Sequence, residues 1–175
     1  MLDRCENCGV ALQRGLDVDL AAEWKAISRA DADGSRAIEI PNRSSLQAWI
    51  GVDGWAAIDL SPGRLLLTRK SLELLAKANG HRLERTNWPV LGTNQAWMWQ
   101  TLLNGLTFHP NFAREWRRGR LGPRTARSRL TFVADAVATL LAAPLVAIVS
   151  FPLETAAALA RRGGRLQALA RHAAG

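Results

Sequence analysis

The sequence predicts an α/β domain with a partial sheet of about three strands and a helical, partly apolar insertion. Two segments, residues 17–40 and 68–88, each run from an amphipathic helix through a glycine-containing turn into a short strand. Residues 93–162 are helical by pattern and contain an uncharged apolar segment of 18 residues, 136–153. No G-x-G-x-x-G or G-x-x-x-x-G-K-[ST] motif is present, so the sequence contains no recognisable loop for binding the phosphates of a nucleotide cofactor.

The composition is that of a globular protein. The chain has 175 residues, of which 48% are hydrophobic and 22% charged, which suffices for one domain with a core. The N-terminal residues carry charges and lack the apolar run of a signal peptide, so we expect a cytoplasmic protein. Two cysteines, Cys5 and Cys8, are too few for a disulfide framework and are expected to stay reduced there.

The first unit begins with a helix predicted over residues 17–30, in which apolar residues recur at helical spacing. Either Asp17 or Asp19 is a suitable N-cap. A D-A-D-G turn follows, and residues 37–40 then predict a buried strand that ends at Pro41, because proline cannot continue the hydrogen-bonded ladder.

The second unit follows a short helix predicted over residues 44–50 and a glycine-containing loop. Thr68 is a good N-cap for the next helix, and Gly80 suits the C′ position at its end. Residues 81–88 alternate in polarity and predict a strand.

The remaining elements are mostly helical. Helices are predicted over residues 93–105 and 111–118, followed by an arginine-rich turn. The uncharged apolar segment then predicts a pair of helices separated at Pro144 and Pro152. After two glycines, residues 165–172 predict a last strand.

The sequence contains no complete catalytic or metal-binding motif. Cys5-x-x-Cys8 resembles one knuckle of a zinc ribbon or a redox motif, but no second cysteine pair follows, and the three histidines are far apart in sequence. No G-x-S-x-G or H-E-x-x-H motif is present. We therefore assign no catalytic residue and expect no bound metal.

Positive charge is concentrated in one segment. The chain has a net charge of +8, and a local net charge of +6 lies between Arg114 and Arg129, where Glu115 is the one acid. Such a cluster predicts contact with phosphates of lipid or nucleic acid. Its seven arginines are Arg114, Arg117, Arg118, Arg120, Arg124, Arg127 and Arg129.

The apolar segment that follows these arginines indicates which phosphates they contact. Arginines on both of its flanks favour a helix pair lying in the membrane interface, with the charged side chains at anionic headgroups. Two core helices and a single membrane span remain alternatives, although Pro144 disfavours a span. Trp116 among the arginines also permits RNA binding by stacking, which we consider less favoured.

One stretch, residues 19–49, resembles the class I S-adenosylmethionine-dependent methyltransferases, where a helix, a glycine turn and the fifth strand end in Pro-Asn before a serine-started helix. The loop at residues 51–59 resembles a glycine–tryptophan–aspartate segment of that family. A threonine-capped leucine-rich helix, a sixth strand at 81–88 and a closing G-G-x-L at residues 163–166 are also similar.

The resemblance implies a Rossmann-like sheet made of the fifth to seventh strands and a substrate-side half of an enzyme. The counterpart of the first four strands, with the S-adenosylmethionine loop, is missing, so we expect this chain to bind no cofactor alone. Asn42, Trp55 and Asp59 carry over as candidate substrate-binding residues. The family's histidine after the loop aspartate is replaced by Gly63, which leaves no catalytic role to transfer.

We expect the chain to be divided into four parts. They are the CxxC segment at residues 1–16, the methyltransferase-like half at 17–92, the helical insertion at 93–162, and the closing strand with its tail at 163–175. We expect a methyltransferase-like protein that is inactive alone and peripheral on the inner face of the membrane. One alternative is an S-adenosylmethionine-dependent enzyme that needs a complementing chain or a second copy of itself. The other is an arginine-rich RNA-binding or membrane-adaptor module.

Overall fold

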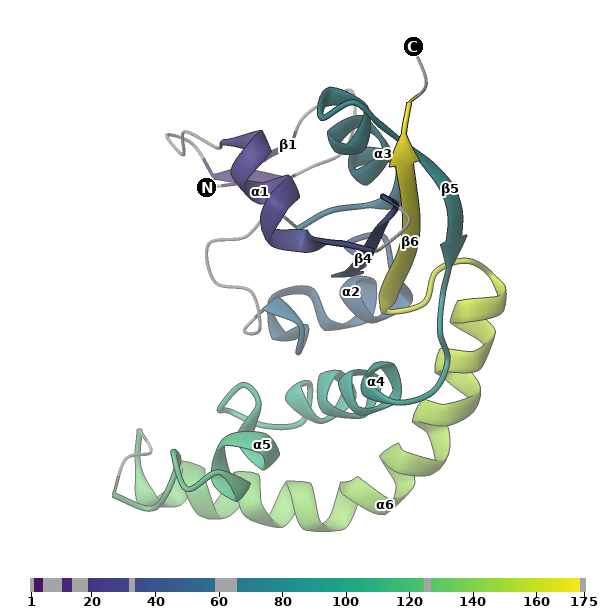
Figure 1. The fold of residues 1–175 in the computed structure, drawn as a ribbon. Helices are drawn as coiled ribbons and strands as arrows, with labels where there is room; N and C mark the ends of the chain where they lie inside the picture. The colour runs from purple at the N-terminus through teal and green to yellow at the C-terminus, as the bar shows by residue number, and fades with distance from the viewer. Residues whose placement is uncertain are drawn as a thin grey trace.

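The computed structural model describes residues 2–4, 11–13, 19–31, 34–58, 66–124 and 127–173. These residues form a sheet with two helices against it, and a helical part in which one long helix curves around the others (Figure 1). The helices are α1 (Leu20–Ile27), α2 (Leu46–Gly51), the 3-10 helix η1 (Val52–Gly54), α3 (Arg69–Ala78), α4 (Thr93–Asn104), α5 (Phe112–Arg117) and α6 (Arg129–Leu159). The strands are β1 (Leu2–Arg4), β2 (Ala11–Gln13), β3 (Ser28–Ala30), β4 (Arg36–Pro41), β5 (His81–Asn87) and β6 (Arg165–His172).

The main sheet has four strands in the order β3-β4-β6-β5. Every neighbouring pair is antiparallel, so β4 and β5 run parallel to each other on either side of β6. The three strands expected from the sequence are confirmed, and the α/β class with them. Strands β1 and β2 form a separate antiparallel pair.

The fourth strand, β3, corrects the sequence-based prediction of a helix over residues 17–30. Helix α1 begins after Asp19, whose carboxylate accepts hydrogen bonds from the amides of Ala21 and Ala22, at 2.9 and 3.1 Å. The helix ends at Ile27, and the next residues extend and pair with β4, Ser28 opposite Ile38. The apolar period continues through residue 30, but pairing with a neighbouring strand outweighs this local preference.

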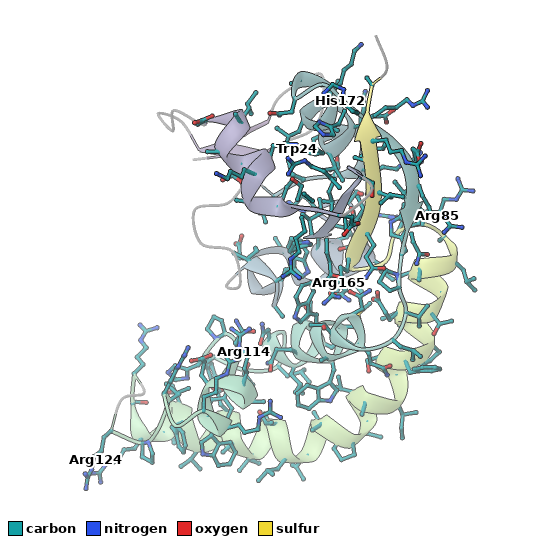
Figure 2. All side chains as sticks on the ribbon, viewed as in Figure 1. Trp24, Arg85, Arg114, Arg124, Arg165 and His172 are labelled. Carbon is teal, nitrogen blue, oxygen red and sulfur yellow. The ribbon has the colours of Figure 1, made fainter. Side chains whose placement is uncertain are left out.

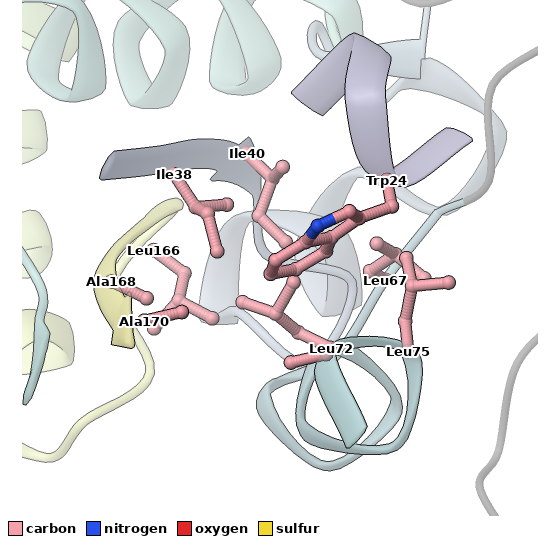
Figure 3. Packing of buried hydrophobic residues seen from close by; sticks show 10 residues of the cluster. Trp24, Ile38, Ile40, Leu67, Leu72, Leu75, Leu166, Ala168 and Ala170 are labelled. Carbon is pink, nitrogen blue, oxygen red and sulfur yellow. The ribbon is translucent and has the colours of Figure 1, made fainter. Parts of the chain in front are cut away.

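One face of the sheet carries the core. Alternate residues of β4 and β6 point to this face, where they pack against Trp24 of α1 and the leucines of α3 (Figure 3). The opposite face carries exposed residues such as Ala37, Glu39 and Arg85. Antiparallel sheets commonly expose one polar face in this way. The labelled core residues are Trp24, Ile38, Ile40, Leu67, Leu72, Leu75, Leu166, Ala168 and Ala170.

Helix α3 begins and ends where the sequence predicts. The Thr68 side chain accepts a hydrogen bond from the Ser71 amide at 3.2 Å, and the Ser71 hydroxyl accepts one from the Thr68 amide at 2.7 Å. This reciprocal capping box satisfies two amides that the helix leaves unpaired. Gly80, just past the helix end, has a φ of +73°, which glycine adopts without steric cost.

The expected helix pair over residues 136–153 is wrong, because α6 is a single helix of 31 residues with Pro144 and Pro152 inside it. A proline ring clashes with the carbonyl four residues earlier and bends the helix away from the ring. Both prolines are exposed, and Figure 1 shows α6 curving along the helical part and up to the sheet. The two prolines therefore bend the helix instead of ending it.

Candidate functional site

The outer side of α6 is a continuous apolar surface, which we call the α6 apolar face. Its large side chains are between 46% and 80% exposed. They recur every three or four residues, so they share one side of the helix. The residues are Leu130, Val133, Val137, Leu140, Leu141, Leu145, Ile148, Val149, Phe151 and Leu159.

The inner side of α6 is unusually polar. Four of its buried residues are Asp135, Thr139, Ser150 and Glu154, which lie on one stripe because their separations are close to whole helical turns. Helix α6 is long and apolar enough to cross a membrane, but only 17% of its most apolar window is buried. The alternative of two core helices is therefore wrong, since the apolar residues point outward and polar ones point inward.

Asp135 anchors the N-terminal half of α6 to the loop after α4. Its carboxylate accepts hydrogen bonds from the amides of Phe108 and His109, at 2.7 and 3.0 Å, and from Nδ1 of His109 at 2.7 Å. Nε2 of His109 accepts a hydrogen bond from the Arg127 amide at 3.2 Å. Both imidazole nitrogens are thus occupied by structural bonds, and this histidine–aspartate pair holds the arginine-rich turn in place instead of serving as a base.

Glu154 anchors the C-terminal half of α6 to the beginning of β6. Its carboxylate accepts hydrogen bonds from the Gln47 amide group at 2.8 Å and from the Gly164 amide at 2.9 Å. Burial raises the pKa of Glu154, while the bonds from Gly164 and Gln47 lower it by less. A Cβ on Gly164 would overlap the Gln47 amide group, so a larger residue here would have to displace that side chain from its hydrogen bonds.

The polar cluster around Glu154 extends into α4. Gln47 Nε2 also donates to the Asn94 carbonyl at 2.9 Å, and the Asn94 side chain donates to the Pro89 carbonyl. Glu154, Gln47 and Asn94 are all fully buried. Because no solvent reaches the carboxylate, the cluster is a structural junction of α2, α4, α6 and β6, and no substrate has access to it.

The arginine cluster is partly neutralised by its own acid. Glu115 contacts Arg114 at 3.3 Å, Arg118 at 3.8 Å and Arg120 at 3.7 Å. The other four arginines, Arg117, Arg124, Arg127 and Arg129, are exposed. Figure 2 shows Arg114 on α5 and Arg124 at the far end of the helical part. The seven side chains therefore form a spread basic surface beside the beginning of α6.

Trp116 lies within a small aromatic group. Its ring centroid is 5.4 Å from that of Phe112 and 5.8 Å from that of Phe132, edge-on to the latter. These contacts attach α5 to α6. The indole is thus engaged in packing, which leaves less of it to stack on a base.

A cavity of about 800 Å³ lies between α4, α5 and α6. Trp97 and Trp99 of α4 line it together with Arg114 and Arg117 of α5 and Arg118, the C-terminal cap of α5. The Trp99 indole is fixed because its N–H donates to the Ala143 carbonyl of α6 at 3.1 Å. The cavity combines an aromatic wall with guanidinium groups, which suits an anion that has an apolar part.

Of the candidate substrate residues, the two that the structure describes, Asn42 and Trp55, do not line this cavity. The Asn42 side chain is buried, donates to the Gly163 carbonyl at 3.0 Å and accepts from the Ser44 hydroxyl at 2.7 Å. Trp55 is buried beside Ala48 and Ala57. Asp59 lies outside the described residues.

Within the described ranges, no three histidine, cysteine, aspartate or glutamate side chains gather in a way that could hold a metal. Cys5 and Cys8 lie between β1 and β2, outside the described residues.

Sequence reasoning missed the polar inner stripe of α6. Asp135 and Glu154 are visible in the sequence as the two charges that bound the uncharged segment. The available signal is their helical phase, because both fall on the side opposite the large aliphatic residues. That pattern indicates a helix whose polar side faces the protein.

No protein-family model, no curated protein and no solved structure matches this chain.

Proposed function

We propose that this chain is a peripheral membrane protein that binds an anionic membrane surface through the α6 apolar face and the flanking arginines. The observation that supports this most directly is the orientation of α6, whose polar residues face the protein and whose aliphatic residues face outward. A water-soluble protein rarely exposes so large a contiguous apolar patch without a partner. Each of these aliphatic side chains gains roughly 1 kcal/mol when its exposed part leaves water.

Charge favours a membrane over a second copy of the chain as that partner. The seven-arginine segment lies at the beginning of α6, and Arg161 and Arg162 lie exposed just after its end. A second copy would bring the same positive charge to the interface. Anionic headgroups bring the opposite charge, at the depth where the arginines flank the apolar face.

An interfacial position is favoured over a span. The inner side of α6 packs against α4 and α5, and both helices carry polar residues such as Gln95, Arg117 and Arg118. A span would carry these residues and the buried carboxylates into hydrocarbon, where unpaired polar groups are costly. Lying in the interface immerses only the apolar face.

The test is flotation of the purified chain with lipid vesicles, either all phosphatidylcholine or with added phosphatidylserine. The variant Leu141→Gln/Leu145→Gln removes apolar surface from the middle of the α6 apolar face, and we expect it to weaken binding to anionic vesicles by at least about tenfold. The matched control Leu20→Gln/Leu74→Gln alters two leucines that are also exposed, but on α1 and α3, and should bind like the wild type.

Three outcomes would contradict this proposal. They are a wild-type chain that does not float with anionic vesicles, equal loss in the variant and its control, and a stable dimer in sedimentation whose formation requires Leu141 and Leu145. A gel shift with RNA tests the nucleic-acid alternative. Tight RNA binding without vesicle binding would favour that alternative.

We further propose that the sheet is methyltransferase-like but not catalytic in this chain. Support comes from the formation of β4, β5 and β6 where the resemblance places them. The alternative of a complementing chain faces an obstacle, because β3 already pairs with β4 from Arg36 to Ile38. A partner sheet joining at that edge would have to displace β3.

A further inference from the structure

We propose that the cavity between α4, α5 and α6 binds the headgroup of a lipid phosphomonoester, the phosphatidic acid class. This inference rests on the proposed membrane binding and specifies which lipid is preferred. Three arginines line the cavity, Arg114, Arg117 and Arg118, and all belong to α5 or its C-terminal cap.

The positive charge of the site favours a ligand with two negative charges over a ligand with one. Three guanidinium groups line the cavity, and Glu115 contacts two of them, Arg114 and Arg118. The local charge is therefore +2. A phosphomonoester carries a charge of about −1.5 to −2 at neutral pH, whereas phosphatidylserine has a net charge of about −1. Guanidinium groups also match phosphate oxygens in geometry, since each can donate two parallel hydrogen bonds.

The rest of the lining suits the apolar part of a lipid next to its headgroup. Trp97 and Trp99 of α4 line the cavity, and Ala147 and Ser150 line it from α6. Trp99 is held by the Ala143 carbonyl, and Arg165 lies 5.5 Å over the Trp97 ring. The walls are thus fixed before a ligand arrives, which lowers the entropic cost of binding.

The cavity also lies at a suitable depth. It is on the inner side of α6, and a helix is about 10 Å across. When the α6 apolar face enters the acyl boundary, the inner side of the helix stays at the level of the headgroups. A phosphate in the bilayer can then reach α5 without the lipid leaving the membrane.

The experiment compares flotation on two vesicle preparations with equal surface potential, one containing phosphatidic acid and the other phosphatidylserine. The wild-type chain should bind the phosphatidic acid vesicles about tenfold more tightly. Arg117→Gln/Arg118→Gln should lose this preference while still binding phosphatidylserine vesicles. The matched control Arg124→Gln/Arg129→Gln removes the same charge from residues outside the cavity, and should weaken binding to both vesicles while keeping the preference.

The outcomes separate this inference from the proposed membrane binding. Equal binding of the wild type to both vesicles would overturn the headgroup site alone, and binding to neither would overturn both. Glycerol 3-phosphate serves as the soluble probe. If it binds without vesicles and abolishes flotation on phosphatidic acid at micromolar concentration, the site takes a free phosphomonoester, and the lipid assignment is wrong.

Discussion

Glu154 shows how a single buried carboxylate positions the surface that we propose to be functional. Its oxygens connect α6 to Gln47 of α2 and to Gly164 at the beginning of β6. The sequence indicates Gly163-Gly164 only as a turn. It does not reveal that Gly164 has to leave room for the Gln47 amide, because the two residues are far apart in the chain and meet only in the folded protein.

The raised pKa of Glu154 predicts how stability depends on pH. Because burial favours the protonated carboxyl, the folded chain holds this proton above the ordinary pKa of 4.5, where the unfolded chain has released it. The contribution of Glu154 to stability therefore falls as the pH rises from that value through the raised pKa. Glu154→Gln removes the titration, so the melting temperature of the wild type minus that of the variant should decrease over this range.

The control for this measurement is Glu73→Gln, which changes an exposed carboxylate on α3. The difference in melting temperature between the wild type and this control should not change over the same pH range. If the difference for Glu154→Gln is also independent of pH, the buried carboxylate does not titrate in this way.

At the scale of elements, the capped helix α3 and the three strands β4, β5 and β6 were the most predictable features. The Thr68 cap, the Gly80 position and the strands at β4, β5 and β6 follow from local chemistry, and the structure confirms them. Strand β3 was not predictable, because pairing with β4 stabilises it. The continuity of α6 was missed because proline disfavours a helix locally, while contacts along the inner side of α6 keep this helix intact.

Removing the cap of α3 should destabilise the sheet and its helices. Thr68→Ala deletes the side-chain oxygen that accepts from the Ser71 amide, and we expect the free energy of unfolding to fall by about 1 kcal/mol. Urea denaturation followed by circular dichroism measures this loss. Ser128→Ala removes the same kind of cap from the exposed beginning of α6 and should cost less, because that end can fray without disturbing the core. A larger loss for Ser128→Ala would contradict this account.

At the scale of the whole molecule, the chain combines a sheet with helices on one face and a helical part that presents apolar surface outward (Figure 1). The fold class and the basic segment were predictable from composition and periodicity. The cavity was not, since its walls come from three helices and depend on the path of α6. The candidate substrate residues Asn42 and Trp55 turned out to be engaged in internal packing and hydrogen bonds, which local motifs cannot distinguish from a pocket.

The proposed lack of catalysis gives a prediction for the whole chain. Calorimetric titration with S-adenosylmethionine should give no binding at micromolar concentrations, because the sequence contains no glycine-rich loop to hold the cofactor. Micromolar affinity for S-adenosylmethionine would overturn the proposal, and methylation only after addition of a second polypeptide would support the complementing alternative.

The bend of α6 has a consequence for the shape of the membrane that this chain would prefer. A straight helix touches a flat bilayer along its whole length, whereas an arc touches it along a short segment, with both ends lifted. Helix α6 curves around the other helices (Figure 1), and its exposed apolar residues lie opposite the buried polar ones that face those helices, which is the outside of the arc. Their contact with a leaflet that is hollow toward the protein, such as the inner wall of a narrow neck, is therefore longer than their contact with a flat sheet.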